Sequence, residues 1–178
     1  MKTVKIKDKE FSLSIKADEI NNIVSKLAKK INKDYENKNP IFLVILNGSF
    51  MFASDLFKKL DIQCEISFLK VASYQGTNTT GKVNTILGLT ENIEGRSVVI
   101  IEDIVDTGNT IYELIKILTP QNPAEIKICT LLFKPNAYKR EIKLDYVGIE
   151  IPNDFIVGYG LDYDGFGRNL GDIYKIIE

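Results

Sequence analysis

The segment Val98–Thr110 constrains the fold of this chain more than any other. It contains an apolar run, the adjacent carboxylates Glu102 and Asp103, a third carboxylate at Asp106, and a Thr-Gly-Asn-Thr turn. The apolar run predicts a buried parallel strand, and the small and hydroxyl residues after it predict the start of a helix. Backbone N–H groups at a helix start bind phosphate, and carboxylates bind sugar hydroxyls or a metal ion. The segment therefore favours a site for a phosphorylated sugar.

The composition is typical of a globular protein. The chain has 178 residues, of which 44% are apolar and 26% charged, and this predicts a single domain over residues 1–178. The net charge of −1 argues against a general attraction to nucleic acid or to an anionic membrane. The sequence shows no apolar signal-peptide core and no run of 18 apolar residues, so we expect a cytoplasmic protein without a membrane partner.

The chain contains no histidine, and this excludes several classes of site. Catalysis by Ser-His-Asp or Cys-His groups and zinc binding by histidine are impossible. A bound metal is then expected to be one that prefers oxygen ligands, such as magnesium. Cys64 and Cys129 lie in apolar alternating segments and are expected to be reduced core thiols.

Apolar strands alternate with helical segments along the chain. Helices are expected at 20–35, 50–60 and 109–119, and strands at 41–46, 64–73, 83–89, from 98 onward, and at 126–133, 145–150, 156–157 and 173–177. This order predicts an α/β fold with a mainly parallel twisted sheet and helices on both faces. Ligands bind beyond the carboxyl ends of such strands, so four loops are candidates for the site. They follow Leu46, Ile104, Phe133 and Val157.

The segment Val98–Thr110 has two other interpretations. Asp106 or Thr107 can serve only as a helix cap, but capping does not account for Glu102 and Asp103 at the preceding strand end. A strand that ends in acids is also typical of nucleotide hydrolases, but the chain has no G-x-x-x-x-G-K-[ST] loop. The glycines between 158 and 171 do not match a dinucleotide fingerprint.

The same segment resembles the phosphoribosyl-pyrophosphate signature of type I phosphoribosyltransferases. Its Glu-Asp-Ile-Val-Asp-Thr-Gly form is similar to the hypoxanthine/guanine branch of that family. Further segments resemble the family's other site segments in the same order: Leu46–Phe52, Ser73-Tyr74, Leu132–Pro135, Phe155–Tyr163 and Arg168. The resemblance covers nearly the whole chain. It implies the type I phosphoribosyltransferase fold, in which the N- and C-terminal segments form a small hood.

The resemblance implies a reaction and roles for the first motif. In the family, the 5-phosphoribosyl group passes from phosphoribosyl pyrophosphate to N9 of hypoxanthine or guanine, and pyrophosphate leaves. Glu102 and Asp103 would hold the ribose hydroxyls, directly or through magnesium. Asp106 would be the general acid or base at the purine N7, and we expect burial and nearby carboxylates to raise its pKa. The 5′-phosphate would lie against Asp106, Thr107, Gly108, Asn109 and Thr110.

The resemblance also implies residues for the purine and for magnesium. Lys134 would donate to the purine O6, Phe155 would stack on the ring, and the backbone of Ile156 would contact the ring edge. Asp162 would lie beside the purine and bind a second magnesium ion next to the pyrophosphate. Without the resemblance, Lys134 is expected to be a surface lysine, Phe155 a core residue and Asp162 a solvated loop residue.

Two loops complete the expected site. Ser73 and Tyr74, with the polar segment after them, would form a lid that excludes water from the reacting sugar. Asn47, Gly48 and Arg168 would bind the pyrophosphate. Asn47 departs from the family pattern, because a lysine or arginine commonly stands there. The family often holds the peptide bond before this residue in cis, which here is the bond Leu46–Asn47.

The resemblance therefore implies a magnesium-dependent transferase of the hypoxanthine/guanine branch, with hypoxanthine as the expected substrate and guanine as a second one. The alternative from another class is a regulator that keeps this fold and binds nucleic acid, against which the balanced charge argues. A transferase for xanthine or adenine is a third reading. The resemblance implies a homodimer or homotetramer, and the sequence does not select between them.

Overall fold

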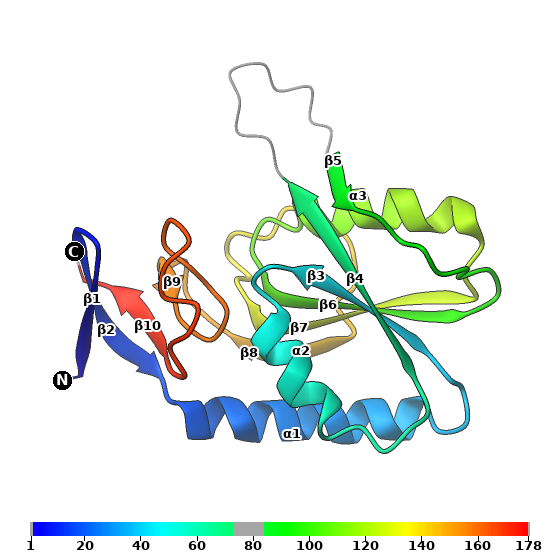
Figure 1. Cartoon of the computed structure of the whole chain (residues 1–178), viewed down its shortest axis with the longest axis horizontal. Coiled ribbons are helices and arrows are strands. Elements are labelled where there is room, and N and C mark those ends of the chain that lie inside the picture. Colours follow the sequence, from blue (N-terminus) through cyan, green and yellow to red (C-terminus); the bar gives the residue numbers. More distant parts are fainter. Residues whose placement is uncertain (1, 73–83, 178) are drawn as a thin grey trace.

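The computed structural model describes residues 2–72 and 84–177, and its larger unit is a twisted sheet (Figure 1). In this part of the chain the sheet has the strand order β5-β4-β3-β6-β7-β8. Strands β4, β3, β6, β7 and β8 run parallel, and β5 pairs with β4 in the antiparallel sense. The strands are β3 (Ile41–Leu46), β4 (Glu65–Ala72), β5 (Asn84–Leu87), β6 (Ser97–Val105), β7 (Glu125–Phe133) and β8 (Tyr146–Glu150).

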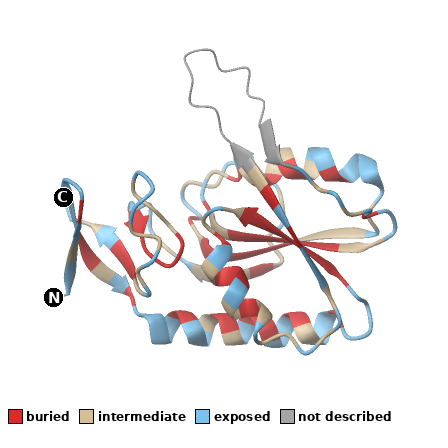
Figure 2. Ribbon diagram, in the orientation of Figure 1, coloured by how far each residue is buried: buried red, intermediate tan, exposed pale blue. Residues whose placement is uncertain are grey.

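Helices cover both faces of this sheet, as expected. Helices α1 (Ala17–Asp34) and α2 (Phe50–Phe57) pack on one face, and α3 (Asn109–Leu118), followed by the short helix η1 (Thr119–Gln121), packs on the other. Strand β3 shows the cause, because its alternate side chains point to opposite faces. Phe42 and Val44 belong to the first core, and its odd-numbered residues belong to the second. Figure 2 shows the central strands buried and the outer helix surfaces exposed.

A second, smaller sheet forms the predicted hood. Its order is β1-β2-β10-β9, with antiparallel neighbours, and Figure 1 shows it at one end of the molecule. Its strands come from both ends of the chain: β1 (Thr3–Ile6), β2 (Lys9–Ile15), β9 (Ile156–Val157) and β10 (Ile173–Ile176). Ile6, Phe11, Val157 and Tyr174 form its buried core.

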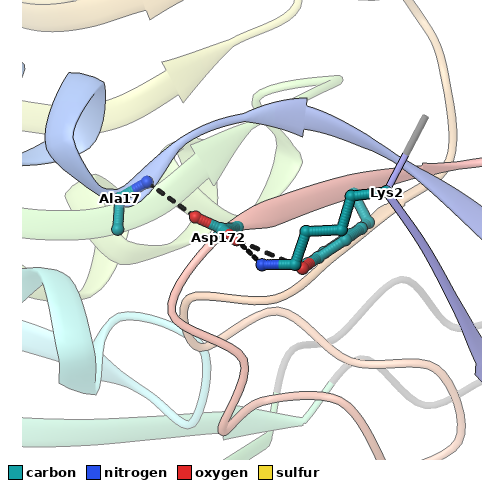
Figure 3. Close-up of polar contacts among 4 residues, drawn as sticks. Lys2, Ala17 and Asp172 are labelled. Atoms are coloured by element: carbon teal, nitrogen blue, oxygen red, sulfur yellow. Dashed lines mark hydrogen bonds and ion pairs between the residues drawn. The ribbon is translucent and has the colours of Figure 1, made fainter.

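Asp172 joins the hood to the main body. Its Oδ1 accepts a hydrogen bond of 2.8 Å from the backbone N–H of Ala17, the first residue of α1 (Figure 3). Its Oδ2 lies 2.7 Å from Lys2 Nζ and 3.2 Å from the Tyr174 hydroxyl, which donates to it. Lys16, at the N-cap position of α1, makes no side-chain capping bond. A residue distant in sequence therefore supplies the cap.

The expected elements agree with the structure except at some ends. Helix α2 ends at Phe57 rather than near residue 60, and β5 spans Asn84–Leu87 rather than 83–89. The hairpin of β1 and β2 was not assigned from the sequence. Among the described residues, no helix is long and apolar enough to cross a membrane.

Candidate active site

The carboxyl ends of the parallel strands bring the expected motifs together. Val105 at the end of β6 is in register with Phe133 at the end of β7, so Asp106 and Lys134 begin adjacent loops. The loop after β3 reaches the same edge, because β3 also pairs with β6. The fourth loop, residues 158–172 between β9 and β10, is called the hood loop below.

Glu102 and Asp103 carry the strongest electrostatic perturbation in the site. Glu102 is 8% exposed, and its Oε2 has no hydrogen-bond partner among the described residues. Burial, together with the charge of Asp103, raises the pKa of Glu102 well above its usual value. Burial also raises the pKa of Asp103 to about 6, against the backbone N–H of Ile104, which donates 2.9 Å to its Oδ1. Both carboxyl groups can therefore bind a cation or accept a hydrogen bond from a hydroxyl group.

Glycines allow three loops to meet at Asp103. A Cβ on Gly48 would overlap the Asp103 carboxylate, and a Cβ on Gly160 would overlap the backbone carbonyl oxygen of Gly48. Gly160 also has a φ of 99°, which L side chains rarely adopt. The buried Ser49 adds a polar link, because its Oγ accepts 3.0 Å from the backbone N–H of Asp103. The loop after β3 therefore contacts both the end of β6 and the hood loop.

The hood loop carries Asp162 and Arg168 as a pair. An Arg168 nitrogen lies 2.6 Å from Asp162 Oδ1, and another donates 2.7 Å to the carbonyl of Gly160. The charge of Arg168 lowers the pKa of Asp103, and that of Asp162 raises it, so all three groups interact. Asp162 and Arg168 of the hood loop therefore lie close to Asp103.

The loop after β3 also contains the departure from the family pattern. The peptide bond between Leu46 and Asn47 is cis, as the resemblance implies. The side chain of Asn47 is exposed and makes none of the hydrogen bonds found among the described residues. No cation stands at this position.

The loop between β6 and α3 encloses a pocket of about 250 Å³, called the β6–α3 pocket below. Gly108, with a φ of 80°, is the N-cap of α3, and it has no side chain to cap the helix. Thr107 Oγ1 instead accepts a hydrogen bond of 3.4 Å from the backbone N–H of Asn109, the first residue of the helix. The other N–H groups of the first helical turn remain available to a ligand. The pocket is lined by Glu102, Ile104, Val105, Asp106, Thr107, Gly108, Asn109, Thr110 and Ile111.

Asp106 and Lys134 form a second pair at the mouth of the site. Lys134 Nζ lies 3.5 Å from Asp106 Oδ2, and Lys134 is only 8% exposed. The side chain of Asp106 is 49% exposed, so the expected burial of this residue is wrong. The reason is its place in the loop beyond the last residue of β6. The residues with buried carboxyls are Glu102 and Asp103, which still belong to the strand.

Phe155 lies at the junction of the hood and the main body. It is 45% exposed, and its ring centroid is 5.9 Å from that of Tyr163 and 6.3 Å from that of Phe11. Its neighbour Ile156 is buried in β9, where it pairs with Lys175 of β10. Phe155 therefore packs against aromatic residues of the hood, and the exposed part of its ring can stack on a planar ligand.

Some site residues could not be found from the sequence, and some lie outside the structure. Ser49 and Gly160 were not assigned, and only their short, polar, glycine-containing loops give a signal. Ser73 and Tyr74, the expected lid, lie outside the described residues.

Comparison with known proteins supplies the family. A model described as "Phosphoribosyl transferase domain" matches residues 16–164. Hypoxanthine-guanine phosphoribosyltransferases of Staphylococcus aureus and Streptococcus pneumoniae are each 44% identical over 154 residues, which is 86% of this chain and 86% of each relative. A crystal structure of a hypoxanthine phosphoribosyltransferase from Staphylococcus aureus matches with a TM-score of 0.88 and 41% identity, and covers 93% of this chain and 91% of its own. This chain belongs to the phosphoribosyltransferase family.

Proposed function

We propose that this protein is a purine-salvage enzyme that converts hypoxanthine, and also guanine, to the nucleoside monophosphate with phosphoribosyl pyrophosphate as donor. The products are IMP or GMP and pyrophosphate. One observation carries the proposal: a phosphate-ready helix start, the buried carboxylates of β6 and the Asp106–Lys134 pair lie at one edge of the sheet. The names of the relatives support the same purines.

The donor sugar binds along β6 and its loop. The carboxylates of Glu102 and Asp103 accept hydrogen bonds from the ribose hydroxyls, for which the unpartnered Oε2 of Glu102 is suited. The 5′-phosphate enters the β6–α3 pocket, where Thr107 and Thr110 add hydroxyl donors to the N–H groups of the helix start. This arrangement places C1′ of the sugar toward Asp106 and the hood.

The purine binds between the hood and the Asp106–Lys134 pair. The Lys134 ammonium donates to the purine O6, Phe155 stacks on the ring, and the backbone of Ile156 contacts its edge. As N9 forms its bond to C1′ and pyrophosphate leaves, Asp106 accepts the proton from N7. The exposed position of Asp106 allows this contact, and Lys134 Nζ lies 3.5 Å from its Oδ2.

The pyrophosphate binds at the loop after β3 and at the hood loop. The backbone of Asn47 and Gly48 donates to it, and Arg168 supplies the positive charge that Asn47 lacks. The contact of Gly48 with both Asp103 and Gly160 keeps these groups close to one another. Ser73 and Tyr74 close over the bound substrates in this proposal.

The carboxylates of this edge suit magnesium. The metal prefers oxygen ligands and retains water and substrate oxygens, so it does not require a complete cage of protein groups. Such a cage is absent from residues 2–72 and 84–177, where no three His, Cys, Asp or Glu side chains are grouped to hold a metal. The buried, unpartnered Oε2 of Glu102 fits the role, and Asp103 and Asp162 complete the proposed set. Magnesium held by these residues would supply positive charge to neutralise the pyrophosphate.

The test is a steady-state comparison of four purines. The purified protein is mixed with phosphoribosyl pyrophosphate, magnesium and, in turn, hypoxanthine, guanine, xanthine and adenine. We expect IMP from hypoxanthine and GMP from guanine, and a much lower rate with the other two. Absence of product with both hypoxanthine and guanine contradicts the proposal. Product only from xanthine or adenine assigns the enzyme to a different purine.

The nucleic-acid-binding alternative is not supported, and two further properties stay proposals. The matched relatives are named as enzymes and give no support to a nucleic-acid-binding regulator. The side chains of Phe50, Ile66 and Phe68 are 44%, 40% and 40% exposed. A homodimer or homotetramer would cover such large apolar side chains. Sedimentation of the purified protein tests this oligomeric state. A cytoplasmic location also stays a proposal, and fractionation of cells that express the protein tests it.

A further inference from the structure

The segment Tyr138–Arg140 lies against the β6–α3 loop residue by residue. The backbone N–H of Lys139 donates 3.2 Å to the carbonyl of Thr107. The ring of Tyr138 fills the space beside Gly108, where a Cβ would overlap it. Arg140 contacts the side chain of the next residue along the loop, Asn109. Three consecutive residues therefore hold three consecutive residues of the proposed phosphate site.

The contact between Arg140 and Asn109 uses two donors. Arg140 Nε and Nη2 donate to Asn109 Oδ1 at 3.1 Å and 2.7 Å. A guanidinium group has no acceptor, so the amide oxygen must face it and the amide NH₂ must face elsewhere. The guanidinium carbon also lies 4.2 Å from the ring centroid of Tyr112, one turn into α3. The ring and the amide together fix the orientation of the guanidinium group.

The charges of the β6–α3 pocket make this arginine important. Its lining residues all lie within the described part of the chain, and none of them carries a positive charge. Two of them, Glu102 and Asp106, are acidic, which opposes the binding of a phosphate dianion. Arg140 places a cation directly behind the lining residue Asn109. It therefore offsets this repulsion from outside the pocket.

We propose that Arg140 is a positioning residue for the 5′-phosphate of the donor: it aims the Asn109 amide NH₂ at the phosphate and supplies positive charge behind it. The inference rests on the proposed function, because that function places a phosphorylated ribose in this pocket. Arg140 follows Lys134 by six positions, so one loop serves both the purine and the phosphate.

The first experiment separates binding of the donor from the other steps. Arg140→Ala is expected to raise KM for phosphoribosyl pyrophosphate about tenfold, because the Asn109 amide loses its fixed orientation and the pocket loses the nearby positive charge. The values of kcat and of KM for hypoxanthine are expected to change less than about threefold. Lys116→Ala is the matched control: Lys116 also lies 4.2 Å from the Tyr112 ring centroid but does not contact Asn109, so its KM values should remain those of the wild type.

Two further variants separate orientation from charge. Arg140→Lys keeps the charge without the two-donor fork and should recover only part of the loss. Asn109→Asp keeps an acceptor for Arg140 but removes the NH₂ donor, so it should raise KM for the donor as well. If Arg140→Ala lowers kcat and alters both KM values together, Arg140 has only a structural role and the inference is wrong.

A binding measurement tests the role of Arg140 independently of the transferase activity. Calorimetry with ribose 5-phosphate is expected to show binding to the wild type and about tenfold weaker binding to Arg140→Ala, at an unchanged melting temperature. If no purine gives product but this difference is found, the proposed function fails and the role of Arg140 at a sugar phosphate stands. Equal affinity of the two proteins, or no binding to either, overturns the inference.

Discussion

Gly48 occupies the most crowded position in the site. Its α-carbon faces the Asp103 carboxylate on one side, and its carbonyl faces Gly160 on the other. A methyl group there would displace either the carboxylate or the hood loop. Because the proposed chemistry depends on the relative placement of ribose and pyrophosphate, a small displacement at this point affects the reaction strongly.

Gly48→Ala is therefore expected to lower kcat/KM for the donor about 100-fold, the effect of a misplacement near 1 Å. Steady-state kinetics with hypoxanthine measures it. Gly171→Ala is the control, because a Cβ there meets nothing within 4 Å, and its kinetics should match the wild type. Wild-type activity in Gly48→Ala would show that the loop can move without consequence.

The role of Asp106 as the proton acceptor gives a second prediction at this scale. Asp106→Asn keeps the size of the side chain and removes its basicity, so kcat should fall by roughly 10²–10⁴. Binding of phosphoribosyl pyrophosphate, measured by calorimetry, should be largely retained. Asp61→Asn, at an exposed carboxylate outside the site, is the control. An unchanged kcat in Asp106→Asn would assign the proton to another group.

At the scale of elements, helix α1 depends on a residue from the other end of the chain. Asp172 occupies the place of an N-cap side chain and also pairs with Lys2 and Tyr174. The hydrogen bond from Lys2, with that from the N–H of Ala17, lowers the pKa of Asp172. Its ionised form is therefore the one that stabilises the fold.

Asp172→Ala is expected to lower the free energy of unfolding by about 1 kcal/mol at pH 7, the usual cost of a lost cap. Because the folded-state pKa is lowered, the contribution is present above the ordinary pKa near 4 and is lost as the pH falls through the folded value. Denaturation at pH 7 and at pH 3 should give a difference in unfolding free energy that is smaller at pH 3. Lys2→Ala, at a side chain that is 60% exposed, should cost less. A difference that is as large at pH 3 as at pH 7 would exclude ionisation of the carboxylate as its cause.

The elements differ in how far the sequence predicts them. Strand β3 and the first half of β6 are buried on both faces, so their continuous apolar runs identify them. The first hairpin is short and rich in lysine, and its exposed residues mask the alternation of Phe11 with its neighbours. Close approaches such as that of Gly160 to Gly48 depend on tertiary placement, which no local pattern contains. The exposure of the Asp106 side chain also depends on tertiary placement, so the sequence did not predict it.

For the whole molecule, we propose that residues 1–178 form one cooperative unit despite their two sheets. The hood loop reaches Asp103 through Gly48, and Asp172 caps α1. Partial opening of the hood would break both contacts and expose Ile15, Ile156 and Ile173, which belong to the core that the hood shares with α1. These links favour joint unfolding of the two sheets.

Urea unfolding followed by circular dichroism and by tyrosine fluorescence should therefore give coincident single transitions. Amides of β10 and β6 should also lose protection from hydrogen exchange at similar free energies. A hood transition at lower urea concentration, seen as early exchange of β10 alone, would show two independent units.

The hood draws its strands from residues 3–15 and 156–176, so its assembly is tied to the order of synthesis. A growing chain makes β2 early but acquires its neighbour β10 only about 160 residues later. Until β10 is synthesised, one edge of β2 has no paired strand. The hood loop, which carries Arg168, is then not yet held between β9 and β10. The main sheet can form while the chain is still on the ribosome, whereas the pyrophosphate side of the site is completed last. Nascent chains therefore pass through a stage in which the sugar-phosphate half of the site exists without the half that closes it.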